Sequence, residues 1–156
     1  MQLSWLEAQA NDAPCTLKDL EAAGVTYAFL STDPAQFEPQ LAKLCESKGY
    51  VARDEVALSE NTPNLQGLKD KFKDEHLHTD DEVRFVLEGA GIFDIRSVDD
   101  RWMHIEVEPG DVLVVPAGRN HRFLLTDACR IRCVRLFRDM AGWTPVYRHP
   151  PQPAAL

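Results

Sequence analysis

The stretch of sequence that decides the fold is EHLHTDDEVRFVLEGAG, residues 75–91. Successive side chains of a β-strand point to opposite faces, so His76 and His78 point to the same face and can reach one metal ion. In a continuous strand Glu82 would lie roughly 13 Å beyond His78, at about 3.3 Å per residue. Because a metal–ligand bond is only about 2 Å long, the chain must fold back between them. Residues 79–81, Thr-Asp-Asp, suit that turn.

A third imidazole is predicted from His121, which follows the turn sequence Pro116-Ala117-Gly118 and opens another strand. A His-x-His pair alone can arise by accident on a surface strand. Here an accident would also have to explain Glu82 and the position of His121. The other two histidines, His104 and His149, are isolated and are interpreted as surface or locally hydrogen-bonded side chains.

The predicted ligands are three nitrogens and one carboxylate, a set that suits iron, nickel, manganese, cobalt, copper or zinc better than calcium or magnesium. An octahedral ion with four protein ligands keeps about two positions open for a substrate or oxygen. Structural zinc sites are usually closed and include cysteine, and no cysteine lies near the motif. The pattern therefore predicts a catalytic centre.

The motif begins a series of short segments rich in Val, Ile and Phe and separated by turn residues, at 82–87, 91–95, 102–107, 111–115, 121–125 and 131–137. Their even spacing predicts an antiparallel sandwich or barrel. Upstream, the patterns predict helices at 17–23, from Asp33-Pro34 to Gly49, and after Thr62-Pro63, with a strand at 50–58. We expect one mainly β domain over residues 1–149, with an N-terminal α/β elaboration, and a disordered tail at 150–156.

The composition excludes several classes of protein. The 156 residues carry a net charge of -8, which argues against a nucleic-acid partner. The N-terminus lacks the pattern of a signal peptide, and no apolar run is long enough to span a bilayer. The four cysteines form no CxxC pair, and Cys129 and Cys133 would lie roughly 13 Å apart in one strand. Free thiols in the cytoplasm are predicted.

The metal-ligating residues resemble the two signature motifs of the cupin superfamily. The first, G-x5-H-x-H-x3-E-x6-G, is matched by His76, His78, Glu82 and Gly89. The second, G-x5-P-x-G-x2-H-x3-N, is matched by Gly110, Pro116, Gly118 and His121. Asp70 and Leu125 replace the leading glycine of the first motif and the closing asparagine of the second. The resemblance implies a double-stranded β-helix, or jelly-roll, barrel.

A closer resemblance, strongest over residues 60–145, is to the acireductone dioxygenase family of methionine salvage. It rests on Glu75 to Phe85 running into residues 88–91, and on a helix that opens after residues 61–63 and ends in Lys71-Phe72. The resemblance implies a monomer with one Fe2+ or Ni2+ that cleaves an acireductone with O2. It also implies two product sets: a 2-oxo acid and formate with iron, or a carboxylic acid, formate and carbon monoxide with nickel.

Candidate substrate residues follow from strand alternation and from the same resemblance. Arg84 shares the inward face of Glu82, and Phe123 shares that of His121. Arg135 has apolar or thiol neighbours on its face, so it is predicted to point inward. The family resemblance implies that the substrate pocket is lined by Phe72, Arg84, Phe123 and Arg135 and closed by Trp143.

Each of these side chains has a structural alternative. An inward arginine can simply pair with Glu82 or another carboxylate, and Phe72 and Phe123 can be ordinary core residues. Glu75 can be a second-shell partner of a ligating imidazole or an exposed carboxylate. Two other functions also remain open: a different cupin dioxygenase, and a metal-dependent module that binds a small ligand without turnover.

Overall fold

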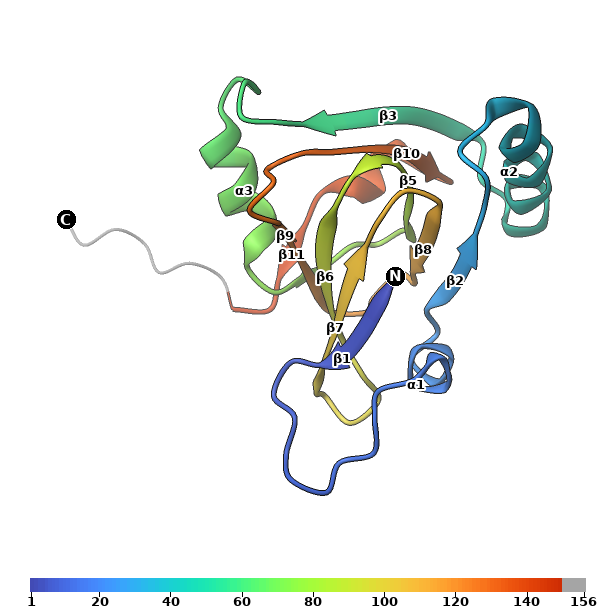
Figure 1. Ribbon diagram of the computed structural model, residues 1–156. Coiled ribbons are helices and arrows are strands. Elements are labelled where there is room, and N and C mark those ends of the chain that lie inside the picture. Colours follow the sequence, from blue (N-terminus) through green and yellow to red (C-terminus); the bar gives the residue numbers. More distant parts are fainter. Residues whose placement is uncertain (150–156) are drawn as a thin grey trace.

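The computed structural model describes residues 1–149, and the tail predicted at 150–156 lies outside the described residues. Two antiparallel sheets form the body of the protein (Figure 1). The first contains, in spatial order, β1 (Gln2–Trp5), β7 (Trp102–Val107), β6 (Gly91–Arg96), β9 (His121–Leu125), β4 (His76–Leu77) and β11 (Val146–Tyr147). The second contains β2 (Thr26–Phe29), β8 (Asp111–Val115), β5 (Glu82–Gly89), β10 (Ile131–Phe137) and β3 (Ala52–Leu58).

The main core lies between the two sheets. On β7 the apolar side chains Met103, Ile105 and Val107 are buried, and the polar residues that alternate with them, His104 and Glu106, are more exposed. This alternation is what a strand with one buried face requires. The core is completed by residues of both sheets and α1, among them Leu20, Val86, Phe93, Ile95, Leu113, Ile131 and Cys133. The predicted mainly β jelly-roll barrel is confirmed.

A second core lies between the outer face of the second sheet and helix α2 (Pro34–Lys48). Phe37 and Leu41 of α2 pack against that sheet. Because β8 is covered on both faces, all five of its residues are buried. The helix begins at Asp33, whose side chain accepts a hydrogen bond from the Ala35 backbone N–H at 3.1 Å. It ends at Gly49, whose φ of 76° is the left-handed conformation that glycine adopts easily.

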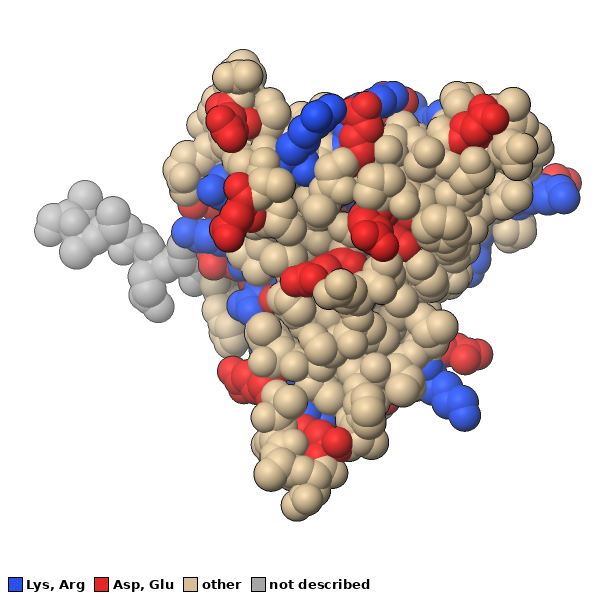
Figure 2. Space-filling view, in the orientation of Figure 1, with Lys and Arg blue, Asp and Glu red and all other residues tan. Residues whose placement is uncertain are grey.

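Three shorter helical segments flank the barrel: α1 (Leu17–Ala22), α3 (Leu65–Lys73) and the 3-10 helix η1 (Met140–Trp143). Helix α3 packs on β9, the strand that begins with His121. No helix in the described part of the chain is long and apolar enough to cross a membrane. Acidic and basic side chains are interspersed on the face shown in Figure 2.

Candidate metal centre

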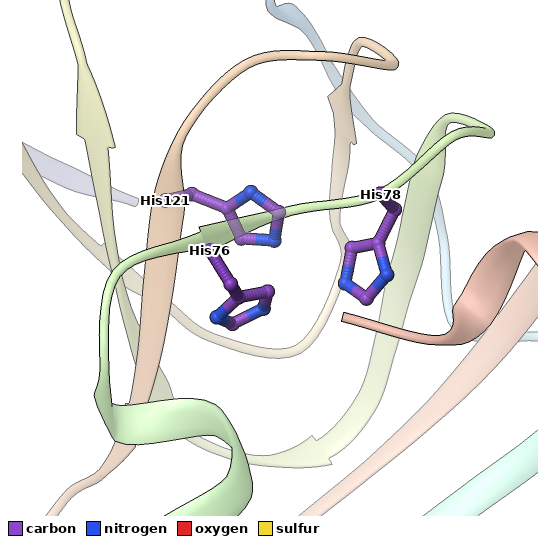
Figure 3. A group of neighbouring side chains, drawn as sticks. All are labelled: His76, His78 and His121. Atoms are coloured by element: carbon purple, nitrogen blue, oxygen red, sulfur yellow. The ribbon is translucent and has the colours of Figure 1, made fainter. Parts of the chain in front are cut away.

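The three histidines of the two motifs meet inside the barrel. His76 on β4 is paired in register with His121 on β9, and His78 follows two residues after His76. Their rings converge (Figure 3), with one nitrogen from each ring within 4.8 Å of the others. The ring centroids lie 4.6 to 5.3 Å apart. All three side chains are buried. The structure therefore brings together the three imidazoles that the sequence predicts as ligands.

Backbone carbonyls orient two of these rings. Nδ1 of His76 lies 2.7 Å from the Asp74 carbonyl oxygen, and Nδ1 of His121 lies 2.9 Å from the Arg119 carbonyl oxygen. A carbonyl oxygen can only accept a hydrogen bond, so each Nδ1 carries the proton and donates it. In the neutral ring each Nε2 then keeps its lone pair, which is the form in which an imidazole binds a metal.

The ring nitrogens that make no hydrogen bond indicate whether a metal fits here. Nε2 of His76, Nε2 of His121 and both ring nitrogens of His78 are buried and make no hydrogen bond within residues 1–149. Buried polar atoms in proteins are nearly always paired, so a cluster of four unpaired nitrogens requires an explanation. A divalent transition metal bound to the ring nitrogens would supply the missing partner. The donor set fits such an ion.

Glu82, the first residue of β5, lies beside the same cluster. Its Oε2 atom is 3.0 Å from Nε2 of His121, and its Oε1 atom is 3.5 Å from Nε2 of His78. Two ligand atoms that are each about 2.1 Å from one ion and at right angles to each other would be separated by ~3.0 Å. The position of Glu82 is therefore compatible with a fourth ligand.

The charges in the cluster suit metal binding. Burial and the neighbouring His121 lower the pKa of His76 to about 4, so this ligand is neutral at neutral pH. Burial alone would raise the pKa of Glu82, but the charges of Arg84 and His121 hold it well below its usual range. Burial would lower the pKa of His121, but the negative charge of Glu82 raises it. The attraction between Glu82 and a positive charge at His121 therefore favours a cation at this position.

The predicted turn between His78 and Glu82 is present, and it is held by the buried Asp80 and the half-buried Asp81. Oδ2 of Asp80 accepts hydrogen bonds from the backbone N–H groups of Arg138 and Asp139, at 2.8 and 3.1 Å. Asp81 accepts from the Tyr50 hydroxyl at 2.8 Å and from the Ala117 backbone N–H at 2.9 Å. The sequence pattern predicts these aspartates only as turn residues. Their partners lie in three distant segments, so the motif itself held no signal of them.

The same turn supports η1 and Trp143. A Cβ atom on Gly142 would lie 2.5 Å from Cβ of Asp80, so η1 rests directly on the turn. Trp143 lines a small cavity together with His78, Glu82 and Arg84. The Nζ atom of Lys71 lies 3.7 Å from the centre of a Trp143 ring, within the range of a cation–π contact.

Three predicted substrate residues line an apolar cavity beside the histidines. Its polar end is formed by Glu82 and Arg84, and Phe72 and Phe123 contribute to its wall. Arg84 donates to Oε1 of Glu82 at 3.0 Å and to the Val83 carbonyl at 2.9 Å. The structural ion pair considered for Arg84 is thus present, and the guanidinium also borders the cavity.

Arg135 and Glu75 have partners that the sequence did not predict. Arg135 binds both carboxylate oxygens of Asp54, its cross-strand neighbour on β3, and lines neither cavity beside Glu82. Glu75 is mostly buried and binds Arg96 and Arg148. The groups that hydrogen-bond to the imidazoles of His76 and His121 are instead the backbone carbonyls of Asp74 and Arg119.

Two facing antiparallel sheets that enclose a buried cluster of three histidines beside a carboxylate define a metalloprotein of the cupin type. Comparison with known proteins gives the family. Residues 7–145 match the model of the ARD/ARD' family, and the chain belongs to that family.

Relatives with assigned names agree with this family. The chain is 42% identical to the acireductone dioxygenase of Heterostelium pallidum over 139 residues, which is 89% of this chain and 94% of that protein. It is 50% identical to the acireductone dioxygenase of a Sulfurihydrogenibium species over 111 residues, 71% of this chain and 62% of that protein.

A solved structure, the acireductone dioxygenase of Bacillus anthracis with a cadmium ion in its active center, superposes with a TM-score of 0.83. It is 32% identical in sequence, and the match covers 93% of this chain and 96% of that one. Together with the histidine cluster, this relative supports a divalent metal ion in the centre described above.

Proposed function

We propose that this chain is a dioxygenase that cleaves the acireductone 1,2-dihydroxy-5-(methylthio)pent-1-en-3-one with O2 in methionine salvage. The observation that carries the proposal is the cluster of three buried imidazoles with unpaired nitrogens, in a chain of this family. In the proposed reaction both oxygen atoms of O2 enter the products. The iron form gives 4-methylthio-2-oxobutanoate and formate, and the nickel form gives 3-methylthiopropanoate, formate and carbon monoxide.

We propose His76, His78, Glu82 and His121 as the ligands of one Fe2+ or Ni2+. A bound ion would supply the Lewis-acid and redox chemistry that the reaction of an ene-diol with O2 needs. The neutral form of His76 and the ionised form of Glu82 are the protonation states that ligation requires.

The residues around the centre are proposed to bind and shield the substrate. The Arg84 guanidinium borders the cavity and can form charge-assisted hydrogen bonds with an anionic ene-diolate. Phe72 and Phe123 give the cavity apolar walls that exclude water. Trp143 covers the side of the centre near His78. Arg135, which the sequence suggested as a substrate residue, is ion-paired with Asp54 and lines neither cavity beside Glu82, so it is not proposed as a substrate contact.

The oligomeric state and the cellular compartment are also part of the proposal. We propose a monomer that acts in the cytoplasm, with residues 1–149 working as one domain. The four cysteines are free thiols, which suits a reducing compartment. Size-exclusion chromatography with light scattering tests the monomer, with a mass of 17.6 kDa expected.

Oxygen uptake tests the reaction. Protein reconstituted with iron or nickel is mixed with synthetic acireductone under air, and oxygen consumption and products are measured. Consumption with both metals, and carbon monoxide only with nickel, is expected. Binding of acireductone without oxygen uptake would instead indicate a ligand-binding module. Uptake with β-diketones but not with acireductone would indicate a different dioxygenase.

A further inference from the structure

Two neighbouring cavities share lining residues, and the inner one borders Glu82 of the candidate metal centre. The inner one has a volume of about 40 Å³ and runs from Glu82 and Arg84 into an apolar end. The outer one has a volume of about 250 Å³ and lies between α3 and β9. Both are lined by Leu58, Phe72 and Phe123. These three side chains come from β3, α3 and β9, and they form a partition between the cavities.

The volumes determine what the inner cavity can hold. A cavity needs about 10–15 Å³ of such space to hold one water molecule, so a space of about 40 Å³ holds about three water-sized groups. A tail of several carbon or sulfur atoms that extends from a substrate bound at Glu82 and Arg84 must therefore press against the partition. Its far end reaches the outer cavity only if the partition yields.

Phe123 occupies a defined place in this partition. Its ring packs on Phe93 of the neighbouring strand β6, with 5.0 Å between the ring centroids. Gly91, on the same strand, leaves room for it: a Cβ atom there would lie 2.6 Å from Cε2 of Phe123 and 2.9 Å from Cδ1 of Ile131. Gly91 therefore serves the fold by its lack of a side chain. Any larger residue would move the Phe123 ring or distort the strand.

The outer cavity is suited to an apolar chain. Besides the partition, its wall includes Leu68, Leu124 and Leu125, and Gln66, Lys69, Asp70 and Lys73 add polar groups. The charge of Asp70 is matched by Lys73 at 3.1 Å, so this pair demands no charged ligand. A hydrocarbon or thioether chain is the chemistry that such a wall accommodates.

We propose that Phe123 sets the length of the substrate tail, and that the outer cavity is a second apolar subsite, closed off by Leu58, Phe72 and Phe123. The inference rests on the proposed function. It predicts that a smaller side chain at position 123 changes the substrate preference. The preferred substrates would then be 1,2-dihydroxy-alk-1-en-3-ones with apolar tails longer than that of the methylthio compound. Burying each further methylene in the outer cavity should improve binding by about fourfold.

The test compares Phe123→Ala and Phe123→Leu with the wild-type metal-loaded enzyme on acireductones of increasing alkyl tail length. We expect Phe123→Ala to raise kcat/KM for tails two or three methylenes longer, relative to the methylthio substrate, by about tenfold or more. Gly91→Ala should shift the preference toward shorter tails. If Gly91→Ala fails to fold, Phe123→Trp can be used instead, because its larger ring also reduces the space for the tail. Phe37→Leu is the matched control, because Phe37 lies in the second core, away from both cavities.

Anaerobic binding of the same series gives a readout that does not depend on turnover. The dissociation constants for Phe123→Ala should fall with tail length over a longer range than those of the wild type. The proposed role of Phe123 would be overturned if the dissociation constants of the wild type and Phe123→Ala depended on tail length in the same way. It would also be overturned if Phe37→Leu changed this dependence as Phe123→Ala does. Failure of the wild type to turn over any acireductone would instead contradict the proposed function, so the two failures are distinguishable.

Discussion

Nε2 of His121 lies 3.0 Å from Oε2 of Glu82, and neither atom makes a hydrogen bond within the described residues. This is the separation expected of two ligands at right angles on one ion. The two side chains come from the two different sheets, on β9 and β5. A metal bound between them would therefore join the sheets as well as carry the chemistry.

Removing the metal should destabilise the protein. A ligand present at 100 times its dissociation constant stabilises the native state by about 2.7 kcal/mol. We expect chelation to lower the melting temperature measured by calorimetry, and His121→Ala to abolish the metal-dependent part of that stability. His104→Ala is the matched control, because His104 contacts Asp94 and lies outside the cluster. An equal loss of bound metal in both variants would argue against the proposed ligands.

Metal affinity should fall as the pH is lowered. The pKa of His121 is raised above its usual value in the metal-free protein, despite burial, by the charge of Glu82. Wherever His121 is protonated, the metal must displace this proton, and lowering the pH increases that competition. His76, with a pKa of about 4, releases no proton near neutral pH. Titration of the metal-free protein with Co2+ between pH 5.5 and 8 checks this, and an affinity independent of pH would contradict it.

Asp80 should couple the ligand turn to η1. Asp80→Asn places an amide N–H₂ where the carboxylate accepts backbone hydrogen bonds from Arg138 and Asp139, and should destabilise the protein by about 1–3 kcal/mol. Asp127→Asn, at an exposed position, should have little effect. Urea denaturation measures both.

The contact between Gly142 and Asp80 gives a separate prediction. Gly142→Ala brings a methyl group within 2.5 Å of Cβ of Asp80, so η1 must shift. Acrylamide should then quench the fluorescence of Trp143 more strongly, with the Trp143→Phe variant used to subtract the other two tryptophans. Unchanged quenching would show that Trp143 is positioned independently of this contact.

The two candidate arginines should respond differently to substitution by lysine. Lysine keeps the charge but lacks the planar guanidinium group. Arg84→Lys should therefore lower kcat/KM by about tenfold or more, through the lost contact with Glu82 and the lost proposed contact with the substrate. Arg135 is held by Asp54 outside the cavities, and Arg135→Lys should change kcat/KM by less than about threefold. Steady-state kinetics on acireductone decides between the two roles. A larger loss in Arg135→Lys would reverse the assignment.

Local sequence patterns predicted most of the fold. The bounds of β7, β8, β9 and β10 agree with the predicted segments at both ends, and α2 begins and ends at the predicted proline and glycine signals. The strands that were not predicted are short, like β1, which pairs with β7 about a hundred residues later. Such strands are formed by long-range pairing, and their local sequence carries little signal.

In the candidate site, too, the local sequence predicted some features, whereas others depend on long-range pairing. The spacing of His76, His78 and His121 was sufficient to predict that their side chains converge. Strand alternation placed Arg135 toward the interior, but its ion pair depends on the register that sets it opposite Asp54 on β3. Register between distant strands follows from the whole sheet, so neither this pair nor the arginines around Glu75 could be predicted from local sequence.

The most direct test of the central claim is oxygen uptake by the protein with and without its metal. The protein is stripped of metal, reloaded with one equivalent of Fe2+ or Ni2+, and mixed with synthetic acireductone under air. We expect oxygen to be consumed in a one-to-one ratio with acireductone only after reloading, and His121→Ala to remain inactive. Oxygen consumption that is the same for the stripped protein, or absent from the fully loaded protein, would contradict the account.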